Sequence, residues 1–579
     1  MVDAAGTTTN AYWAGGRLKI EDGPWASDTV SYGYNGVGLR SSLTNQQPTG
    51  NWIQTYGYDA AKRLTNVTSQ AGTFSYQYSS GVGGASSASA LIQKLSLPNS
   101  SYITNTFDSV SRMLTTKLNN SSHSTLNSHA YVYNAGHQRT KQTRTDGSYV
   151  DYTYDTVSEL QSGKGYTSGG SPISTEQMGY KYDPGWNLNQ RTNNGSVQTF
   201  TVDNQNQLTS DGVNSYSYDS NGNLISKSWS SPSYGSLTYI YDDENQLASV
   251  ATDTSYTPDY ARWKVEFVYD GRMRRRVKKE YTWNSGYGAW QLSSETRYVY
   301  DGNLVIQERN SSNTPTVQYT RGTDLSGSFE GAGGIGGMLS RSTGYSSGTG
   351  NWSTHHHYHA DGNGNITAMV DSGQSISASY KYDPYGKLLT SSGTQAGANL
   401  YRFSSKEFHV NSGLYYYGYR FYDPNIQRWL NRDPIHELGG INLYTTCGNA
   451  PTFYVDPFGL FNYTKFIVGA GSIGWGGFQA SRGVALIVAG GSSTFMGFGV
   501  PAVGLGIKDL AGAGLKLRKG ATQCKEAIPD PDPGNLRNFL GLAPFGTLID
   551  DPGETLGGAW NQIRQMPLWR SGLEIVTYL

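Results

Sequence analysis

Three histidines with alternate spacing could hold a metal ion. They are His355, His357 and His359 in the stretch His355-His-His357-Tyr-His359. Alternate side chains of a β-strand share a face, so the three imidazoles would lie together, and imidazole is a common zinc ligand. The alternative is a repeat strand with exposed histidines. We favour the strand and expect no metal.

A glycine motif further along the chain matches the dinucleotide-binding fingerprint G-x-G-x-x-G. It is Gly469-Ala-Gly471-Ser-Ile-Gly474, and it follows the apolar residues 466–468. The fingerprint also needs an acidic residue about 20 positions later, but the first one here is Asp509. We therefore attribute the match to glycine-rich composition and expect no cofactor.

A basic run could contact nucleic acid. It is Arg272-Met-Arg-Arg-Arg276-Val-Lys-Lys279 and follows Tyr269-Asp270-Gly271, where a repeat strand is expected. Its charges would fall on both faces of that strand, which favours a solvated strand over a binding patch. The whole chain has 44 Lys and Arg against 44 Asp and Glu. No overall field would draw it to nucleic acid, and we predict no nucleic-acid partner.

The elements that must position any site are β-hairpins. The repeated unit is Tyr-x-Tyr-Asp, a few turn residues, then Leu or Arg. Asp can bond the backbone two residues on, and Gly or Asn accepts positive φ, so each unit predicts a hairpin. Clear copies start at Tyr56, Tyr180, Tyr216, Tyr239, Phe267, Tyr298 and Tyr380, and weaker ones lie around Phe107, Tyr131, Tyr152 and Val202.

These hairpins must pair with one another, because a lone hairpin is unstable in water. We predict a mainly β chain in which residues 30–460 form one continuous antiparallel architecture. A long sheet coils under its own twist, so a closed or spiralling shell is expected. The two tyrosines of each unit share a face and could stack on tyrosines of neighbouring strands.

Residues 401–460 add a dense series of motifs that resembles the repeat-associated core of the RHS/YD-repeat family, and the hairpin repeats of residues 30–400 resemble the repeats of that family. The blocks are Gly413-Leu-Tyr-Tyr-Tyr417-Gly-Tyr-Arg420-Phe-Tyr-Asp423-Pro424, Arg428-Trp429-Leu430, Arg432-Asp433-Pro434-Ile435, Gly439-Gly440-Ile-Asn442-Leu-Tyr444 and Asp456-Pro457-Phe-Gly459-Leu460. The resemblance implies hairpins wound into a hollow spiral shell (a β-cocoon), in some members around a toxic C-terminal segment.

The same resemblance implies an aspartyl autoprotease that cuts after the last Leu of the core. Carried over, Asp433 and Asp456 are the paired carboxylates, Arg432 is their neighbour, and the cut falls between Leu460 and Phe461. Two close carboxylates cannot both ionise, so one can act as acid and the other as base. An adjacent arginine would lower a carboxylate pKa and help keep the base charged.

Two positions depart from the family pattern. His436 stands where some members have Gly, and Thr445 stands where certain processed members have an acidic residue. The pair must therefore be Asp433 with Asp456, or be absent. The alternative is that both Asp-Pro pairs only start turns.

The chain divides into four predicted parts: a lead-in (1–30), the repeat shell (31–400), the core (401–460) and a variable tail (461–579). The tail is Gly-rich, and residues 483–507 carry no charge. Such a stretch fits either a membrane-active hairpin or a segment stored in an apolar shell. We expect a small, partly helical end. The tail has no histidine and no G-K-[ST] loop, which disfavours a nuclease.

The leading functional hypothesis is a shell that carries, and releases by autoproteolysis, a C-terminal effector used against competitors. The rival is a surface adhesin or glycan-binding protein, and a third is an inactive fragment. The N-terminus does not match a signal peptide, so we expect a bacterial secreted or cell-surface protein that uses another route and is cytoplasmic before delivery. Expected partners are its own tail inside the shell, a secretion apparatus or cell-surface glycans, and a membrane for the tail.

Overall fold

The computed structural model describes residues 1–79, 89–229, 236–255, 257–460 and 464–465. The described residues belong to a unit that spans Met1–Ser472. The predicted partly helical tail lies outside the described residues apart from Thr464 and Lys465, and Phe461 is also outside them. The four predicted domain boundaries therefore remain predictions.

The described chain is mainly β, as predicted, and every strand pair is antiparallel. After the short hairpin β1 (Val2–Asp3) and β2 (Gly6–Thr7), successive strands pair from β3 to β19. These strands are β3 (Thr9–Tyr12), β4 (Leu18–Asp22), β5 (Val30–Tyr34), β6 (Arg40–Gln46), β7 (Asn51–Tyr58), β8 (Leu64–Ser69), β9 (Gly72–Tyr78), β10 (Ile92–Ser96), β11 (Tyr102–Phe107), β12 (Met113–Asn119), β13 (Thr125–Tyr133), β14 (Arg139–Arg144), β15 (Tyr149–Tyr154), β16 (Leu160–Tyr166), β17 (Pro172–Tyr182), β18 (Leu188–Asn193) and β19 (Ser196–Thr199). Residues 1–30, expected as a lead-in, are thus already strands.

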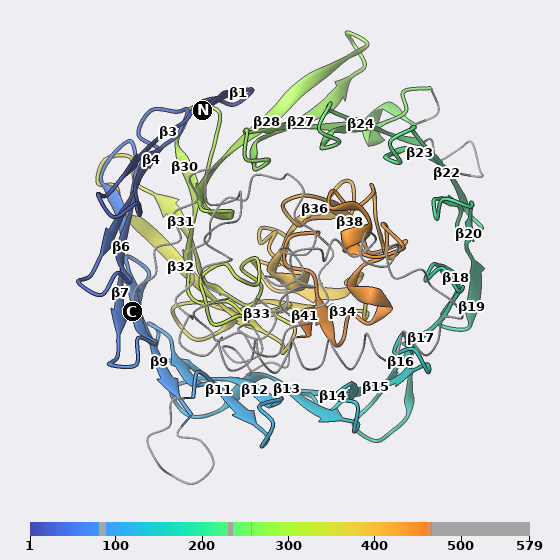
Figure 1. Cartoon of the computed structure of the whole chain (residues 1–579), viewed down its shortest axis with the longest axis horizontal. Coiled ribbons are helices and arrows are strands. Elements are labelled where there is room, and N and C mark those ends of the chain that lie inside the picture. The colour runs from blue at the N-terminus through green and yellow to red at the C-terminus, as the bar shows by residue number, and fades with distance from the viewer. Residues whose placement is uncertain (80–88, 230–235, 256, 461–463, 466–579) are drawn as a thin grey trace, which may run out of the picture. The chain divides into compact units, whose positions relative to one another are not determined.

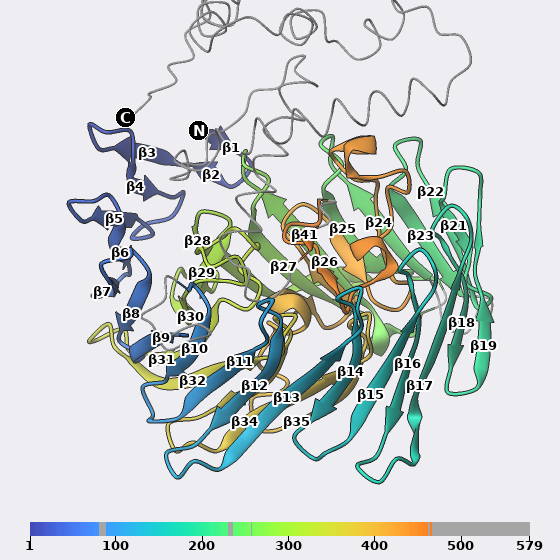
Figure 2. The same ribbon diagram turned by 60° about the horizontal axis from the view of Figure 1, so that its bottom comes forward.

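A second, 16-stranded sheet follows directly, and the chain changes sheet at Phe200. Figures 1 and 2 show its strands continuing the course of the first sheet. Its members are β20 (Thr201–Val202), β21 (Leu208–Ser210), β22 (Asn214–Tyr218), β23 (Leu224–Trp229), β24 (Ser236–Tyr241), β25 (Leu247–Thr252), β26 (Trp263–Tyr269), β27 (Arg275–Asn284), β28 (Ala289–Asp301), β29 (Leu304–Arg309), β30 (Pro315–Arg321), β31 (Met338–Tyr345), β32 (Trp352–Ala360), β33 (Ile366–Val370), β34 (Ile376–Tyr382) and β35 (Leu388–Ser392).

The hairpins close through one recurring turn, which the sequence predicted. In the turn after β22, Asp219 Oδ1 accepts the backbone N–H groups of Asn221 and Asn223, both at 2.9 Å. Gly222 in the same turn has φ +84°, a conformation that suits glycine. The same pair of Asp bonds recurs at Asp108, Asp155, Asp183, Asp203, Asp242, Asp270, Asp361 and Asp383. The turn chemistry therefore defines the repeat.

Neighbouring repeats are linked by a recurring tyrosine hydrogen bond, and ring stacking across neighbouring strands also occurs, between Tyr149 and Tyr166. The second tyrosine of a unit donates its hydroxyl to the backbone carbonyl of the residue that opens an earlier strand, as Tyr58 does to Arg40 at 2.8 Å. The equivalent pairs are Tyr34–Leu18, Tyr78–Leu64, Tyr133–Met113, Tyr154–Arg139, Tyr182–Leu160, Tyr269–Leu247, Tyr300–Arg275 and Tyr382–Ile366. The phenol is amphipathic, so its ring packs in the wall while its hydroxyl ties two repeats together.

The strand ladder winds back onto its own beginning, which makes it a spiral. One buried cluster joins side chains of β5–β12 to Val299, Ile306, Leu339 and Val370 of later strands. Trp52 and Trp352 meet edge to face with ring centres 6.1 Å apart. Figure 1 shows β30, β31 and β32 beside the early strands β3–β9. The wall is therefore double on this side.

The histidine strand is buried rather than exposed. His355, His357 and His359 lie on β32, where His357 and His359 are at most 2% exposed. His359 Nε2 lies 3.1 Å from Thr116 Oγ1, and its ring stacks on His129 at 6.1 Å. Exposure was predicted wrongly because the strand faces a second wall layer that the local sequence does not reveal.

The basic run is buried as well, contrary to the predicted solvated strand. Arg274, just before β27, and Arg275 and Arg276, its first two residues, are at most 3% exposed. Their charges are balanced by the nearby Asp270 and the distant Glu21 beside Arg274, and by two further distant carboxylates, Glu407 beside Arg275 and Asp28 beside Arg276. The run is thus an internal ionic layer.

No helix among the described residues is long and apolar enough to span a membrane.

Candidate active site

The segment 401–460 belongs to the same compact unit as the strands and packs against both large sheets. It contains β36 (Glu407–His409), β37 (Leu414–Tyr416), β38 (Phe421–Asp423), β39 (Arg428–Trp429) and β40 (Tyr454–Val455), which pairs with β41 (Thr464–Lys465), together with the short 3-10 helices η3 (Phe403–Ser405), η4 (His436–Gly439) and η5 (Cys447–Asn449). In Figure 1 this segment, in orange, lies inside the curve of β22–β28. We call residues 401–460 the core segment.

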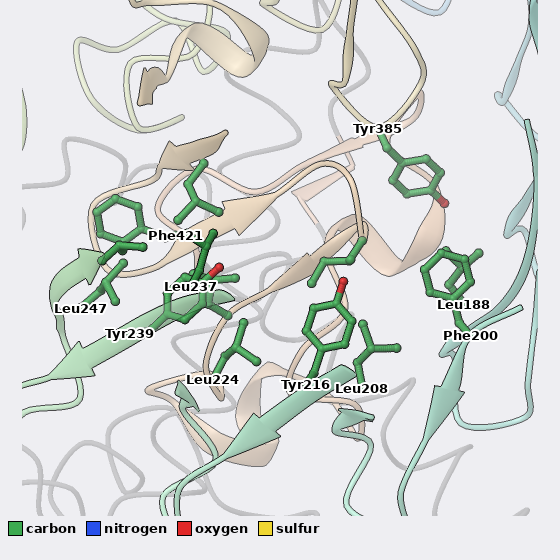
Figure 3. Close-up of a cluster of buried hydrophobic side chains, with 14 of the residues drawn as sticks. Leu188, Phe200, Leu208, Tyr216, Leu224, Leu237, Tyr239, Leu247, Tyr385 and Phe421 are labelled. Carbon is green, nitrogen blue, oxygen red and sulfur yellow. The ribbon is translucent and has the colours of Figure 1, made fainter. Parts of the chain in front are cut away.

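The core segment is fixed by apolar contacts and by bonds to the hairpin turns. Figure 3 shows Phe421 of the core segment, and Tyr385 of the turn between β34 and β35, beside a row of residues that runs from Leu188 to Leu247. The Tyr444 hydroxyl donates to Gly222 O at 2.8 Å, and Arg428 Nη1 donates to Asn187 Oδ1 at 2.9 Å. The repeat turns that close the hairpins therefore also hold the segment in place.

Arg420 brings the two predicted aspartates together. Its Nη2 lies 2.7 Å from Asp433 Oδ2 and 3.8 Å from Asp456 Oδ2, and all three residues are at most 4% exposed. The guanidinium packs over the Trp429 ring at 4.5 Å. A buried cation between two buried carboxylates compensates their charges where solvent does not reach them.

Both aspartates also start turns, so the two interpretations of the Asp-Pro pairs are compatible. Asp433 Oδ1 accepts the Ile435 N–H at 3.0 Å. Asp456 Oδ1 accepts the N–H groups of Phe458, Gly459 and Leu460 at 3.3, 2.9 and 3.1 Å. We call residues 456–460 the cleavage turn, because Asp456 holds the backbone that leads to the predicted cut.

Asp456 can carry a proton at neutral pH. Burial raises the pKa of Asp456 to about 7, an effect that Arg420 opposes and the Asp433 charge increases. Near neutrality one carboxyl of the pair is therefore available in its acid form, which is what acid–base chemistry by two carboxylates requires.

Arg432, expected beside the carboxylates, faces another way. Its Nη2 donates to Gln205 Oε1 at 2.8 Å in an exposed position. Adjacent side chains in a turn diverge, and the neighbouring cation is Arg420, which lies 13 positions before Asp433 in sequence. The motif Gly-Tyr-Arg420-Phe-Tyr contained this residue, but no local spacing connected it to the aspartates.

The two departures from the family pattern have simple structural correlates. His436 has φ +53°, the left-handed region in which glycine is favoured. Thr445 Oγ1 donates to Trp186 O at 3.3 Å, so this position bonds the shell instead of supplying a carboxylate.

Lys406 is a second buried cation that sequence reasoning missed. Its Nζ donates to Pro457 O of the cleavage turn at 2.6 Å. Burial lowers the pKa of its ammonium to about 7, against the opposing effect of the Asp456 charge. The turn is thus contacted by Lys406 at Pro457 and by Arg420 Nε at Gly459 O.

The described residues include no group of three or more His, Cys, Asp or Glu side chains arranged for a metal ion.

Comparisons with known proteins identify toxin-related relatives. No family model matches the chain. It is 27% identical over 353 residues to the tRNA3(Ser)-specific nuclease WapA of Bacillus spizizenii, which is 60% of this chain and 12% of the relative. It is 26% identical over 360 residues to the double-stranded DNA deaminase toxin A of Burkholderia cenocepacia, which is 60% of this chain and 21% of that protein. The chain thus spans only a small part of these relatives.

One solved structure, the crystal structure of TcdB2-TccC3-Cdc42, aligns with 80% of this chain and 28% of its own, at 18% identity and a TM-score of 0.36. The antiparallel strand pairing by itself establishes the mainly β fold.

Proposed function

We propose that this chain is an RHS-type, toxin-related shell protein that holds its C-terminal segment and releases it by aspartyl autoproteolysis between Leu460 and Phe461. The observation that carries the proposal is the buried cluster of Arg420, Asp433 and Asp456, in which Asp456 also binds the cleavage turn. Segment 461–579 is the proposed cargo, so the shell's binding partner is a part of the same chain.

The proposed reaction adds water across the Leu460–Phe461 peptide bond. Asp433, paired with Arg420, accepts a proton from the water, and the acid form of Asp456 protonates the departing amide. The products are a carboxylate on Leu460 and an amine on Phe461. Arg420 also donates through Nε to Gly459 O, which orients the backbone next to the cut.

The relatives support the toxin-related part of the proposal. Those compared are a tRNA nuclease and a DNA deaminase toxin, and each shares only 12% or 21% of its length with this chain. We transfer neither activity to residues 461–579. A nuclease tail also remains disfavoured, because that segment has no histidine to act as a general base.

The glycan-binding alternative gains no support from the repeat tyrosines. Tyr56, Tyr180, Tyr216 and Tyr239 are at most 8% exposed. Their rings are packed in the wall and cannot stack on sugars.

The test compares single-atom substitutions in the full chain. Asn retains the oxygen that accepts the turn bonds, so Asp433→Asn and Asp456→Asn remove the ionisable group and preserve the turn. We expect wild type to run as two pieces and both variants to stay whole. Asp423→Asn is the matched control, because Asp423 is also buried, precedes a proline and caps a turn through Asn425 at 2.8 Å. Cleavage that persists in Asp456→Asn would leave the aspartates as turn formers only.

A further inference from the structure

Lys406 joins two loops that are distant in sequence. Its Nζ donates to Gly333 O at 2.7 Å and to Pro457 O at 2.6 Å. The residue is 7% exposed, and its ammonium lies 5.3 Å from the centre of the Tyr417 ring. A buried ammonium is expensive unless it is well bonded, so its placement on two carbonyls indicates a specific role.

The Gly333 loop is built for close contact with the cleavage turn. Gly333 has φ +60°, and a Cβ added there would lie 1.9 Å from Pro457 O. The loop is held from behind by Asp324, whose Oδ2 accepts the N–H groups of Ala332 at 2.7 Å and Gly334 at 3.0 Å. The cleavage turn therefore rests on a fixed surface that only glycine permits.

The cleavage turn has room to move if this support is lost. A cavity of about 50 Å³ is lined by Lys406, Gly333 and Phe458. Arg420 and Asp456 bind the turn at Gly459 and at the N–H groups of 458–460, but they do not bond the Pro457 carbonyl. Among the residues that the structure describes, Lys406 is the side chain that ties that carbonyl to the opposite loop.

We propose that Lys406, with Gly333 behind it, is a positioning residue that fixes the register of the cleavage turn so that the cut falls after Leu460. This inference rests on the proposed self-processing. Lys406 acts through the Pro457 carbonyl and not on the reacting bond. Displacement of a reacting group by about 1 Å can reduce a rate by about 100-fold.

The first readout is the position and rate of the cut in the full chain. Lys406→Met keeps the apolar stem and removes the donor, and Gly333→Ala moves the Pro457 carbonyl without changing charge. We expect either variant to process at least ~10-fold more slowly and to yield mixed C-termini by mass spectrometry. Lys278→Met is the control, because Lys278 is a buried lysine that contacts Glu280 and Glu407 instead of the turn. A single Leu460 terminus formed at the wild-type rate in both variants would overturn the inference.

The second readout does not depend on self-processing. In an Asp456→Asn background, added chymotrypsin should cut after Phe458 or Leu460 at least ~10-fold faster when Lys406→Met is present, because the turn is freed locally. Cutting at other sites should not change, which also shows that the variant is folded. Equal rates of chymotrypsin cutting after Phe458 or Leu460 with and without Lys406→Met would show that Lys406 does not hold the cleavage turn in place. A wild-type chain that stays whole would reject the proposed function. The chymotrypsin assay would still show whether Lys406 holds the cleavage turn in place.

Discussion

At the scale of single residues, the site depends on one arginine that serves two carboxylates. Arg420 Nη2 is 2.7 Å from Asp433 and 3.8 Å from Asp456, and all three side chains are buried. The family resemblance implied that the two aspartates lie close together. The structure places Arg420 between them, and its positive charge offsets the repulsion between the two carboxylates. Two buried negative charges without a cation would repel and one would remain protonated.

Replacement of Arg420 should therefore affect both folding and processing. Arg420→Gln leaves buried carboxylates without their cation, which typically destabilises a protein by about 3–5 kcal/mol. We expect a lower urea midpoint and no self-processing. Arg432→Gln is the matched control, because Arg432 bonds Gln205 in an exposed position. If Arg432→Gln abolished processing and Arg420→Gln did not, the assignment of the neighbouring cation would be wrong.

The pKa of Asp456 predicts a pH dependence. Its folded value of about 7 lies above the ordinary value of 3.8. Stability from this group is therefore fully present below pH 3.8 and is lost as pH rises through 7. The charged or titratable groups around it are Asp433, Arg420, Lys406 and Cys447.

Self-processing should follow the acid form of Asp456. We expect the rate for newly synthesised chain, transferred to buffers from about pH 6 to 9, to fall as pH rises through about 7 and to approach a tenfold loss per unit above it. Deprotonation of Lys406, whose pKa is also about 7, would act in the same direction. A rate that rises steadily to pH 9 would contradict a role for Asp456 as the acid.

At the scale of elements, the repeat turn was predictable and its cross-links were not. Asp219 and Gly222 carry the turn in their own side chain and backbone, so local sequence is sufficient. The Tyr58 hydroxyl instead bonds a carbonyl 18 residues away. Such a partner depends on strand register, which the repeat spacing leaves open.

The tyrosine link can be measured by removing one oxygen. Tyr58→Phe deletes the bond to Arg40 O and should lower the free energy of unfolding by about 1 kcal/mol. Tyr12→Phe should change it by less than about 0.5 kcal/mol, because Tyr12 is 57% exposed. The free energies of unfolding of the two variants are measured by urea unfolding followed by tryptophan fluorescence. Equal values would show that the bond from Tyr58 to Arg40 O does not stabilise the repeats.

Local pattern predicts the wrong exposure for two strands. It indicates solvent-facing side chains at Arg275 and His359, yet both are at most 1% exposed. Their partners, Glu407 and Thr116, lie more than 100 positions away in sequence. Charge and polarity indicate exposure only where no distant layer supplies partners.

In the whole described unit, the mainly β, antiparallel architecture is confirmed, but residues 30–460 do not form one continuous ladder: it breaks at Phe200, and β36–β39 form a separate four-stranded sheet. Hairpin periodicity was enough to predict a mainly β spiral. It could not predict that β28–β33 would pack on β5–β12, nor that the core segment would dock on the repeat turns. These contacts arise only when the spiral has closed on itself.

One ion pair should report how firmly the core segment is held. Glu407 pairs with Arg275 of β27 and accepts the Tyr298 hydroxyl at 3.0 Å. Glu407→Gln leaves Arg275 buried without a counter-charge and should destabilise the chain by about 3–5 kcal/mol. Glu437→Gln, at an exposed position of η4, should change little. Equal urea midpoints for the two variants would show that this pair does not anchor the segment.

Intact mass spectrometry of the purified full-length protein tests whether the chain cuts itself once, after Leu460. We expect two species, one ending at Leu460 and one beginning at Phe461, with the sum of their masses exceeding that of the intact chain by one water. A single species with the mass of the whole chain, or a cut at another bond, would contradict this expectation.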